Sequence, residues 1–183
     1  MKIGGRNQRI HHITMVGLCV TLITLCSWIY LPMAIPFTLQ TLGVFTVLGL
    51  LGGRLGSVAV SIYLLMGVIG IPVFSGFRGG IGHILQPTGG FLIGFLLASL
   101  TYWLITNLFS RYKYKRAIGM VLGQIACYIT GTLWFIVVNS QADNAISTGA
   151  VITTCVLPFI LPDILKIVIA LILSKRISAW VNH

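Results

Sequence analysis

Charged side chains are scarce in this sequence, and acidic ones are almost missing. Its 183 residues include two aspartates and no glutamate, and charged residues make up 8% of the chain, against about 25% in an ordinary soluble domain. A soluble fold of this length needs a charged surface, which so few charges cannot provide. Hydrophobic residues make up 57%. The composition therefore indicates an integral membrane protein.

Motifs for metal, redox or nucleotide chemistry are also missing. No two cysteines have CxxC spacing, and all lie in apolar stretches, which favours small buried side chains over metal ligands: Cys19, Cys26, Cys127 and Cys155. The chain has no GxxxxGK[ST] loop for the phosphates of ATP. No cluster of histidine, cysteine and carboxylate indicates a catalytic centre, so we expect neither an enzyme nor a cofactor. A membrane enzyme or assembly factor is the alternative.

The net charge of +10 could indicate a nucleic-acid partner, but its distribution favours a membrane. The basic residues gather where apolar stretches end: Lys2, Arg6, Arg9, the cluster from Arg111 to Arg116, Lys175 and Arg176. Such clusters match the positive-inside rule and anionic lipid headgroups rather than a groove for phosphates. Together they predict that both termini are cytoplasmic.

Apolar stretches divide the chain into six predicted spans, each close to the roughly 20 residues that cross a bilayer as helix. They are 13–31, 37–52, 55–71, 89–108, 117–138 and 148–174. We therefore predict an all-α integral membrane protein with six transmembrane helices. Its parts are a basic cytoplasmic segment at 1–12, a membrane domain at 13–174 and a cytoplasmic tail at 175–183. Gly52 and Gly53 mark the joint between the second and third spans.

One acidic residue, Asp163, falls inside the last apolar span, and Lys166 follows three residues later on the same helix face. Each charge at a bilayer centre costs about 2.5–3.5 kcal/mol, so each is expected to have a structural or functional role. The alternative is that the two side chains form an internal ion pair with each other and bind no ligand. A carboxylate beside an ammonium also suits a ligand that presents both an N–H and a C=O, such as a cyclic urea or amide. From the residues alone, the ligand stays open.

The segment 72–90, on the predicted outer side, supplies further candidates. Its glycines, which include Gly79 and Gly80, would let the backbone approach a ligand closely. Arg78 could add a bidentate contact to a carboxylate. The alternative is a flexible outer loop with an arginine at the membrane interface.

Several short motifs occur in a specific order: Pro36-Phe37-Thr38-Leu39-Gln40-Thr41, Gly79-Gly80, Pro87-Thr88-Gly89-Gly90, Tyr128-x-x-Gly131-x-x-Trp134 and Pro162-Asp163-x-x-Lys166. Together they resemble the BioY family, the biotin-specific S components of energy-coupling factor (ECF) transporters. The resemblance covers nearly the whole chain after its basic start. It implies the six-helix S-component fold in a prokaryotic cell membrane, high-affinity capture of biotin near the outer face, and no chemistry on the substrate. It also implies a transmembrane coupling subunit and two cytosolic ATPases, which alone bind ATP.

The resemblance assigns roles to individual residues. Asp163 and Lys166 would hold the ring of the ligand, and we expect its carboxylate to point towards Arg78. The family's outer loop corresponds to Arg78, Gly79 and Gly80, and the motif at the fourth span adds Thr88 and Gly89. Gln40 and Tyr128 correspond to positions that face the cavity.

Two positions depart from the family pattern, which commonly has glycine at both. Gln86 precedes the Pro-Thr-Gly-Gly motif, and Pro162 precedes Asp163 and removes a backbone donor beside the site. Neither change removes a charged group. The biotin prediction therefore stands. An S component for a different vitamin is the second alternative.

The first span carries the predicted partner contact. Gly17 and Thr21 have the small-xxx-small spacing that lets helices pack closely in lipid. S components typically dock such a face on the coupling subunit. Packing within this chain is the alternative.

Overall fold

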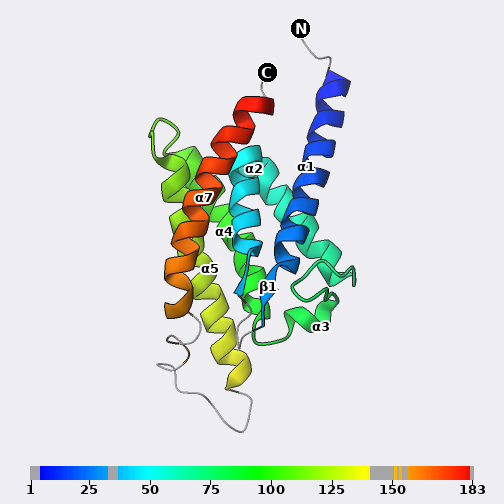
Figure 1. Cartoon of the computed structure of the whole chain (residues 1–183), viewed down its shortest axis with the longest axis vertical. Helices are drawn as coiled ribbons and strands as arrows, with labels where there is room; N and C mark the ends of the chain where they lie inside the picture. Colours follow the sequence, from blue (N-terminus) through cyan, green and yellow to red (C-terminus); the bar gives the residue numbers. More distant parts are fainter. Residues whose placement is uncertain (1–4, 33–36, 141–150, 152, 154–155, 182–183) are drawn as a thin grey trace.

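Helices make up nearly all of the computed structural model, which describes residues 5–32, 37–140, 151, 153 and 156–181 (Figure 1). In chain order they are α1 Gly5–Trp28, α2 Gln40–Val68, α3 Ile81–Ile84, α4 Gly89–Leu108, α5 Lys115–Asn139 and α7 Leu157–Val181. Two short strands, β1 Tyr30–Leu31 and β2 Phe37–Thr38, pair antiparallel between α1 and α2. The all-α prediction is confirmed apart from this ribbon.

Five helices in the described part of the chain are long and apolar enough to cross a membrane, whereas the sequence predicted six spans. The difference lies in α2, which contains two predicted spans and folds back on itself. Gln40 Nε2 donates a 2.9 Å hydrogen bond to the Tyr63 hydroxyl, 23 positions away. A straight helix would separate these residues by about 35 Å. The two arms of α2 therefore run antiparallel, as two spans would.

Gly52 makes this reversal. Its φ of 76° and ψ of 177° lie in a region that is essentially restricted to glycine. The arms then meet closely, because a Cβ on Gly56 would lie 3.1 Å from the Cα of Leu48. The predicted joint at Gly52 and Gly53 is thus a hairpin between two helical arms, with Gly52 itself in a non-helical conformation.

The outer helices extend beyond their predicted limits. Helix α1 begins at Gly5, within the basic cytoplasmic segment predicted at 1–12. Helix α7 begins at Leu157 and continues to Val181, through most of the predicted tail at 175–183. The predicted start of the last span at 148 lies outside the described residues. Hydropathy does not mark these two ends, because Arg6 and Arg9 lie in the first turns of α1 and Lys175 and Arg176 lie in the C-terminal part of α7.

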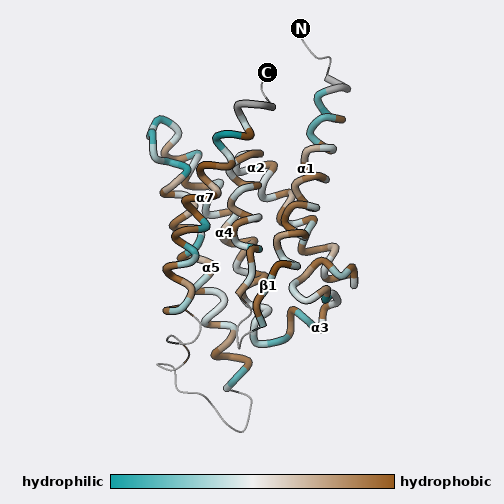
Figure 2. Tube along the Cα trace, in the orientation of Figure 1, coloured by the Kyte–Doolittle hydropathy of each residue, from teal (hydrophilic) through white to brown (hydrophobic). Residues whose placement is uncertain are grey.

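Many large apolar residues on the long helices are exposed, and Figure 2 shows that hydrophobic residues make up most of these helices. Ile13 on α1 is 73% exposed and Leu161 on α7 is 80% exposed. Water would disfavour such a surface, whereas lipid is a suitable solvent for it. The buried core lies between the helices and includes Phe45, Leu48 and Tyr102.

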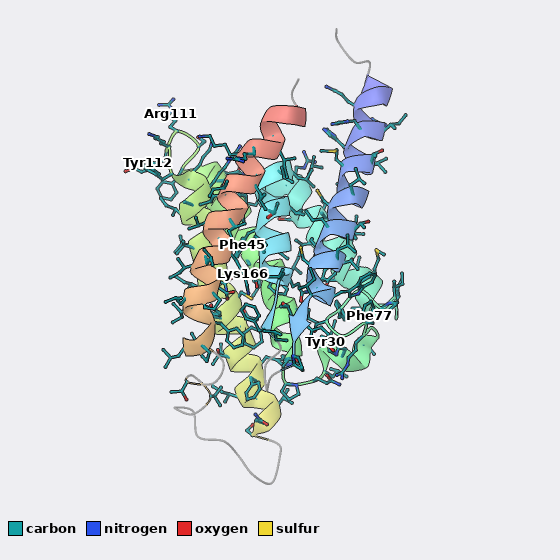
Figure 3. All side chains as sticks on the ribbon, viewed as in Figure 1. Tyr30, Phe45, Phe77, Arg111, Tyr112 and Lys166 are labelled. Atoms are coloured by element: carbon teal, nitrogen blue, oxygen red, sulfur yellow. The ribbon has the colours of Figure 1, made fainter. Side chains whose placement is uncertain are left out.

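The basic loop lies at the same end of the molecule as both termini. Figure 3 labels Arg111 and Tyr112 at this end, and Tyr30 and Phe77 near the opposite end. The β-ribbon and α3 also lie near the opposite end (Figure 1). The fold therefore separates the basic clusters from the segment 72–88, as the predicted topology requires.

Small residues bring α4 and α5 into close contact. A Cβ on Gly94 would lie 2.9 Å from the Cys127 sulfur, and one on Gly123 would lie 2.9 Å from the Ala98 carbonyl oxygen. Close backbone approach of this kind favours helix association in lipid. It fixes the face of α5 that carries Gln124 and Tyr128.

Candidate functional site

Asp163 and Lys166 form a buried ion pair within α7. Lys166 Nζ lies 2.8 Å from Asp163 Oδ1, and the two side chains are 6% and 7% exposed, respectively. Within the described residues this is the sole salt bridge. Pro162 lies inside the same helix and cannot donate to the carbonyl of Pro158, because proline has no N–H. The ion pair that the sequence raised as an alternative is therefore present.

Helix α5 satisfies the second oxygen of this carboxylate. Gln124 Nε2 donates to Asp163 Oδ2 over 2.8 Å, and the Tyr128 hydroxyl donates to the same oxygen over 2.6 Å. These two donors provide partners for the second oxygen of a side chain that is almost completely buried. The pair therefore belongs to a network that joins two helices.

The lysine is also held by an aromatic ring. Lys166 Nζ lies 4.1 Å from the centroid of the Phe37 ring, which stacks on Phe159 at a centroid distance of 6.3 Å. A ring face attracts a cation and offers an apolar wall to a ligand. Strand β2 therefore contributes to the site as well as to the ribbon.

The network borders a cavity of about 80 Å³. Its lining comes from β2, α2, α4, α5, α7 and the segment 75–88: Thr38, Gln40, Thr41, Ser75, His83, Thr88, Phe91, Leu92, Phe95, Gln124, Cys127, Tyr128, Phe159, Asp163 and Lys166. Gln124 Oε1 is buried and has no hydrogen-bond partner. An unpartnered buried acceptor is costly, so it points to a ligand or water that would donate to it. The cavity thus has charged and amide groups at one side and aromatic walls at another.

A second, larger cavity of about 430 Å³ adjoins the first. It is lined by Tyr30, Pro32, Ser75, Gly76, Arg78, His83, Gln86, Pro87, Thr88 and Phe135. Ser75, His83 and Thr88 line both cavities, so they form the boundary between them. We call the cavity at Asp163 the inner cavity and the cavity at Arg78 the outer cavity.

The loop that carries Arg78 is tied to the helices at its first residues. Val73 O accepts hydrogen bonds from Ser27 Oγ over 2.5 Å and from the Tyr63 hydroxyl over 3.0 Å. Trp28 Nε1 donates to Pro72 O over 2.9 Å, and its ring stacks on Phe77. These contacts fix the base of the loop against α1 and α2 and leave its tip beside the outer cavity.

The structure brings most predicted site residues together, but not all of them. Asp163, Lys166, Gln40, Tyr128 and Thr88 line the inner cavity, and Arg78 lines the outer one. The predicted Gly79, Gly80 and Gly89 line neither cavity. A Cβ on Gly79 would lie 2.5 Å from Ile71 O, one on Gly89 would lie 1.7 Å from Ile84 O, and Gly80 N donates to Gly67 O. Gly79 and Gly89 therefore permit close backbone packing beside the cavities, whereas Gly80 has room for a Cβ but adopts a φ of 93° that favours glycine.

Sequence reasoning missed Gln124 and His83. Gln124 is a single amide within an apolar span, a polar signal that could have marked it as a partner for Asp163. No feature of the sequence placed His83 in the site, whereas in the structure it lies at the boundary of the two cavities. The aromatic walls gave no separate signal, because phenylalanine is common throughout the spans.

The predicted partner-contact residues lie on an exposed face of α1. Gly17 and Thr21 line an apolar groove of about 500 Å³ between α1 and the second arm of α2. No atom of the described chain lies within 4 Å of a Cβ built on Gly17. Close packing against this chain, the alternative for Gly17, is therefore not seen among the described residues.

The fold is that of a transporter S component. A solved structure, the S component for biotin from an ECF-type ABC transporter, superposes with a TM-score of 0.85 over 97% of this chain and 95% of the other, at 23% identity. The BioY family model matches residues 3–183. The chain belongs to the BioY family.

Relatives from distant prokaryotes match over most of their length. The biotin transporter BioY of Thermotoga maritima is 34% identical, over 88% of this chain and 92% of the relative. A probable biotin transporter BioY of Pyrococcus horikoshii is 34% identical, over 91% and 95%, and BioY2 of Lactococcus lactis is 32% identical, over 97% and 96%. The chain is thus a multi-pass plasma-membrane protein and a transporter component, not an enzyme.

Proposed function

We propose that this chain is the high-affinity biotin-capture subunit of an ATP-driven vitamin uptake transporter and binds biotin near the outer membrane face. The observation that carries this proposal is the buried Asp163–Lys166 pair beside a cavity, in a chain of the BioY family. Intramembrane charges of this kind mark a substrate site more often than a structural one.

The polar groups of the inner cavity complement a cyclic urea. A ureido ring presents two N–H donors and one carbonyl acceptor. Asp163 and the unpartnered Gln124 Oε1 can accept from the N–H groups, and Lys166 can donate to the carbonyl. The aromatic walls can cover the apolar parts of the ligand. The cavity of about 80 Å³ is smaller than biotin, so the ligand extends into the outer cavity or the walls move apart.

The ligand enters from the outside and its carboxylate points towards Arg78. Both termini share one end with Arg111, which supports a cytoplasmic position for that end. The outer cavity lies on the path between the inner cavity and the loop tip, where Arg78 can contact a carboxylate. The tip of the segment 72–88 closes over the bound ligand, while its base stays attached to α1 and α2.

Energy comes from partner subunits. A transmembrane coupling subunit docks on the face of α1 that carries Gly17 and Thr21, and two cytosolic ATPases bind and hydrolyse ATP. This chain then reorients in the bilayer and delivers biotin unchanged. The exposed groove beside Gly17 supports this assignment.

Isothermal titration of the purified, detergent-solubilised chain with biotin tests the proposal. We expect tight one-to-one binding to the wild type and its loss in Asp163→Asn. The variant Arg111→Gln, at the other end of the molecule, serves as the matched control and should bind as the wild type does.

A competition panel of vitamins separates biotin from the alternative ligand. If another vitamin displaces a fluorescent ligand and biotin does not, the S-component fold stands and the biotin assignment is wrong.

A further inference from the structure

His83 occupies the boundary between the inner and outer cavities. It lies in the short helix α3 and lines both cavities, together with Ser75 and Thr88. Its ring stacks on Phe74 at a centroid distance of 5.5 Å and an interplanar angle of 25°. Any ligand that reaches from Asp163 to Arg78 must therefore pass beside this imidazole.

The imidazole has an unused polar atom. His83 Nδ1 is buried and has no hydrogen-bond partner among the described residues. Burial, and secondarily the positive charge of Arg78, lower the pKa of His83 below its ordinary value, and a hydrogen bond with Gln86 acts in the opposite direction. In the empty protein at neutral pH, His83 is therefore mainly uncharged.

Other charged groups near the imidazole are few. On the outer side it faces Arg78, with Tyr30 and Gln86 in the same lining. On the inner side the lining includes Tyr128 and the pair of Asp163 and Lys166. Asp163 is the sole acidic side chain among the described residues, since Asp143 lies outside them, and its two oxygens already accept three hydrogen bonds. The protein thus offers His83 no free carboxylate.

We propose that His83 and Arg78 together hold the carboxylate of the ligand, and that His83 takes up a proton when this carboxylate binds. The inference rests on the proposed function, because it concerns the outer end of the same ligand. A carboxylate in the boundary region would supply the negative charge that the empty site lacks. The protonated imidazole would then donate from Nδ1 to that carboxylate.

The direction of the pH effect follows from this coupling. A bound anion raises the pKa of His83 relative to the empty protein, because an opposite charge favours the protonated ring. Affinity for the anionic ligand therefore rises as pH falls through the pKa of His83 in the complex and then through its pKa in the free protein, as long as the carboxylate stays ionised. An uncharged amide of the same ligand has no such coupling. A change of one pKa unit between the two states corresponds to about a tenfold change in affinity.

The test is titration of the whole purified chain with biotin and with biotin amide at several values between about pH 5 and pH 8. Repeating the titration in buffers of different ionisation enthalpy measures proton uptake directly. Two variants remove the titrating ring by different means. His83→Phe keeps an aromatic ring to stack on Phe74, and His83→Asn keeps an uncharged polar group. His11→Gln is the control, since His11 is exposed on α1, the helix that starts at the other end of the molecule.

We expect the wild type and His11→Gln to bind biotin about tenfold more tightly at the low end of this range, with proton uptake, and the amide with no such change. Both His83 variants should bind the two ligands with the same pH dependence. Persistence of the biotin-specific effect in both variants would overturn the inference, as would an equal effect on the amide in the wild type. Failure of the wild type to bind either ligand at any pH would instead overturn the proposed function.

Discussion

Tyr128 and Asp163 lie 35 positions apart on different helices, and the Tyr128 hydroxyl donates a 2.6 Å hydrogen bond to Asp163 Oδ2. Lys166 holds the other oxygen of the same carboxylate. One buried carboxylate therefore joins α5 to α7 at the wall of the inner cavity. A ligand that contacts Asp163 acts on both helices at once.

Removal of the Tyr128 hydroxyl should weaken this connection without creating a cavity. We expect Tyr128→Phe to lower stability by about 1.5–3 kcal/mol, the range for a hydrogen bond to a charged group, and to weaken biotin binding. The thermal unfolding midpoint of the detergent-solubilised protein and isothermal titration check both effects. Tyr112→Phe, in the exposed basic loop, is the matched control and should change neither. Equal midpoints for the two variants would contradict the prediction.

The ion pair can be tested for a structural role separately from a binding role. Asp163→Asn leaves the Lys166 ammonium buried without its partner, so we expect a loss of roughly 3–5 kcal/mol in stability. Adding Lys166→Met removes the unpaired buried charge and should recover most of that loss, because the amide oxygen at position 163 can still accept hydrogen bonds from Gln124 and Tyr128. Biotin binding should be absent from both proteins. A double variant that binds biotin as the wild type does would show that the pair is structural only.

The sequence predicted the deepest part of the site because its chemistry is rare in a membrane. Asp163 and Lys166 were identified by the cost of charges in lipid, and the structure brings them to a cavity. Gln124 and His83 were missed because the rotation of a helix and the path of a loop decide which polar groups face inward. Gly79, Gly80 and Gly89 line neither cavity, so their role as ligand contacts stays a prediction.

The fold was predicted at a similar level of detail. The Gly52-Gly53 joint was visible as a break between apolar stretches, and the structure has a non-helical residue there, Gly52, between the two arms of α2. The ends of α1 and α7 were misplaced because hydropathy marks the lipid-facing length rather than the helix itself. The β-ribbon depends on pairing of Tyr30–Leu31 with Phe37–Thr38, which no local pattern indicates.

The hairpin in α2 gives a prediction about stability alone. Gly52→Ala places a Cβ at φ 76° and ψ 177°, which we expect to cost about 1–3 kcal/mol. The Cβ itself has room, so the cost is one of backbone conformation. Gly17→Ala is the control, because Gly17 is in regular helix and also has room. Thermal unfolding in detergent measures the difference, and an unchanged midpoint for Gly52→Ala would argue against the reversal.

Arg78 should distinguish the two ends of the ligand. We expect Arg78→Ala to weaken the binding of biotin by about tenfold or more, because one charge-assisted contact contributes about 1.5–3 kcal/mol. The affinity for the uncharged amide of biotin should change little, since the amide offers Arg78 no anion. Isothermal titration of both ligands against both proteins gives the comparison. If the variant loses biotin and the amide equally, the carboxylate does not meet Arg78.

The exposed face of α1 gives the last prediction, which concerns assembly rather than binding. Gly17→Trp fills the groove between α1 and the second arm of α2 and should prevent a partner helix from approaching, while the chain itself has room for the side chain. Co-expression with the coupling subunit and the ATPases, followed by co-purification, measures assembly, and titration with biotin measures the site.

The neighbouring Leu18→Trp is the matched control for this prediction. Leu18 is 62% exposed and does not line the groove, so its variant should assemble as the wild type does. We expect Gly17→Trp to bind biotin normally and to lose its partners. Assembly of both variants with the partner subunits would show that this face of α1 is not the docking surface. Loss of biotin binding in Gly17→Trp would instead mean that the α1 face supports the packing of this chain, because the cavities lie elsewhere in the fold.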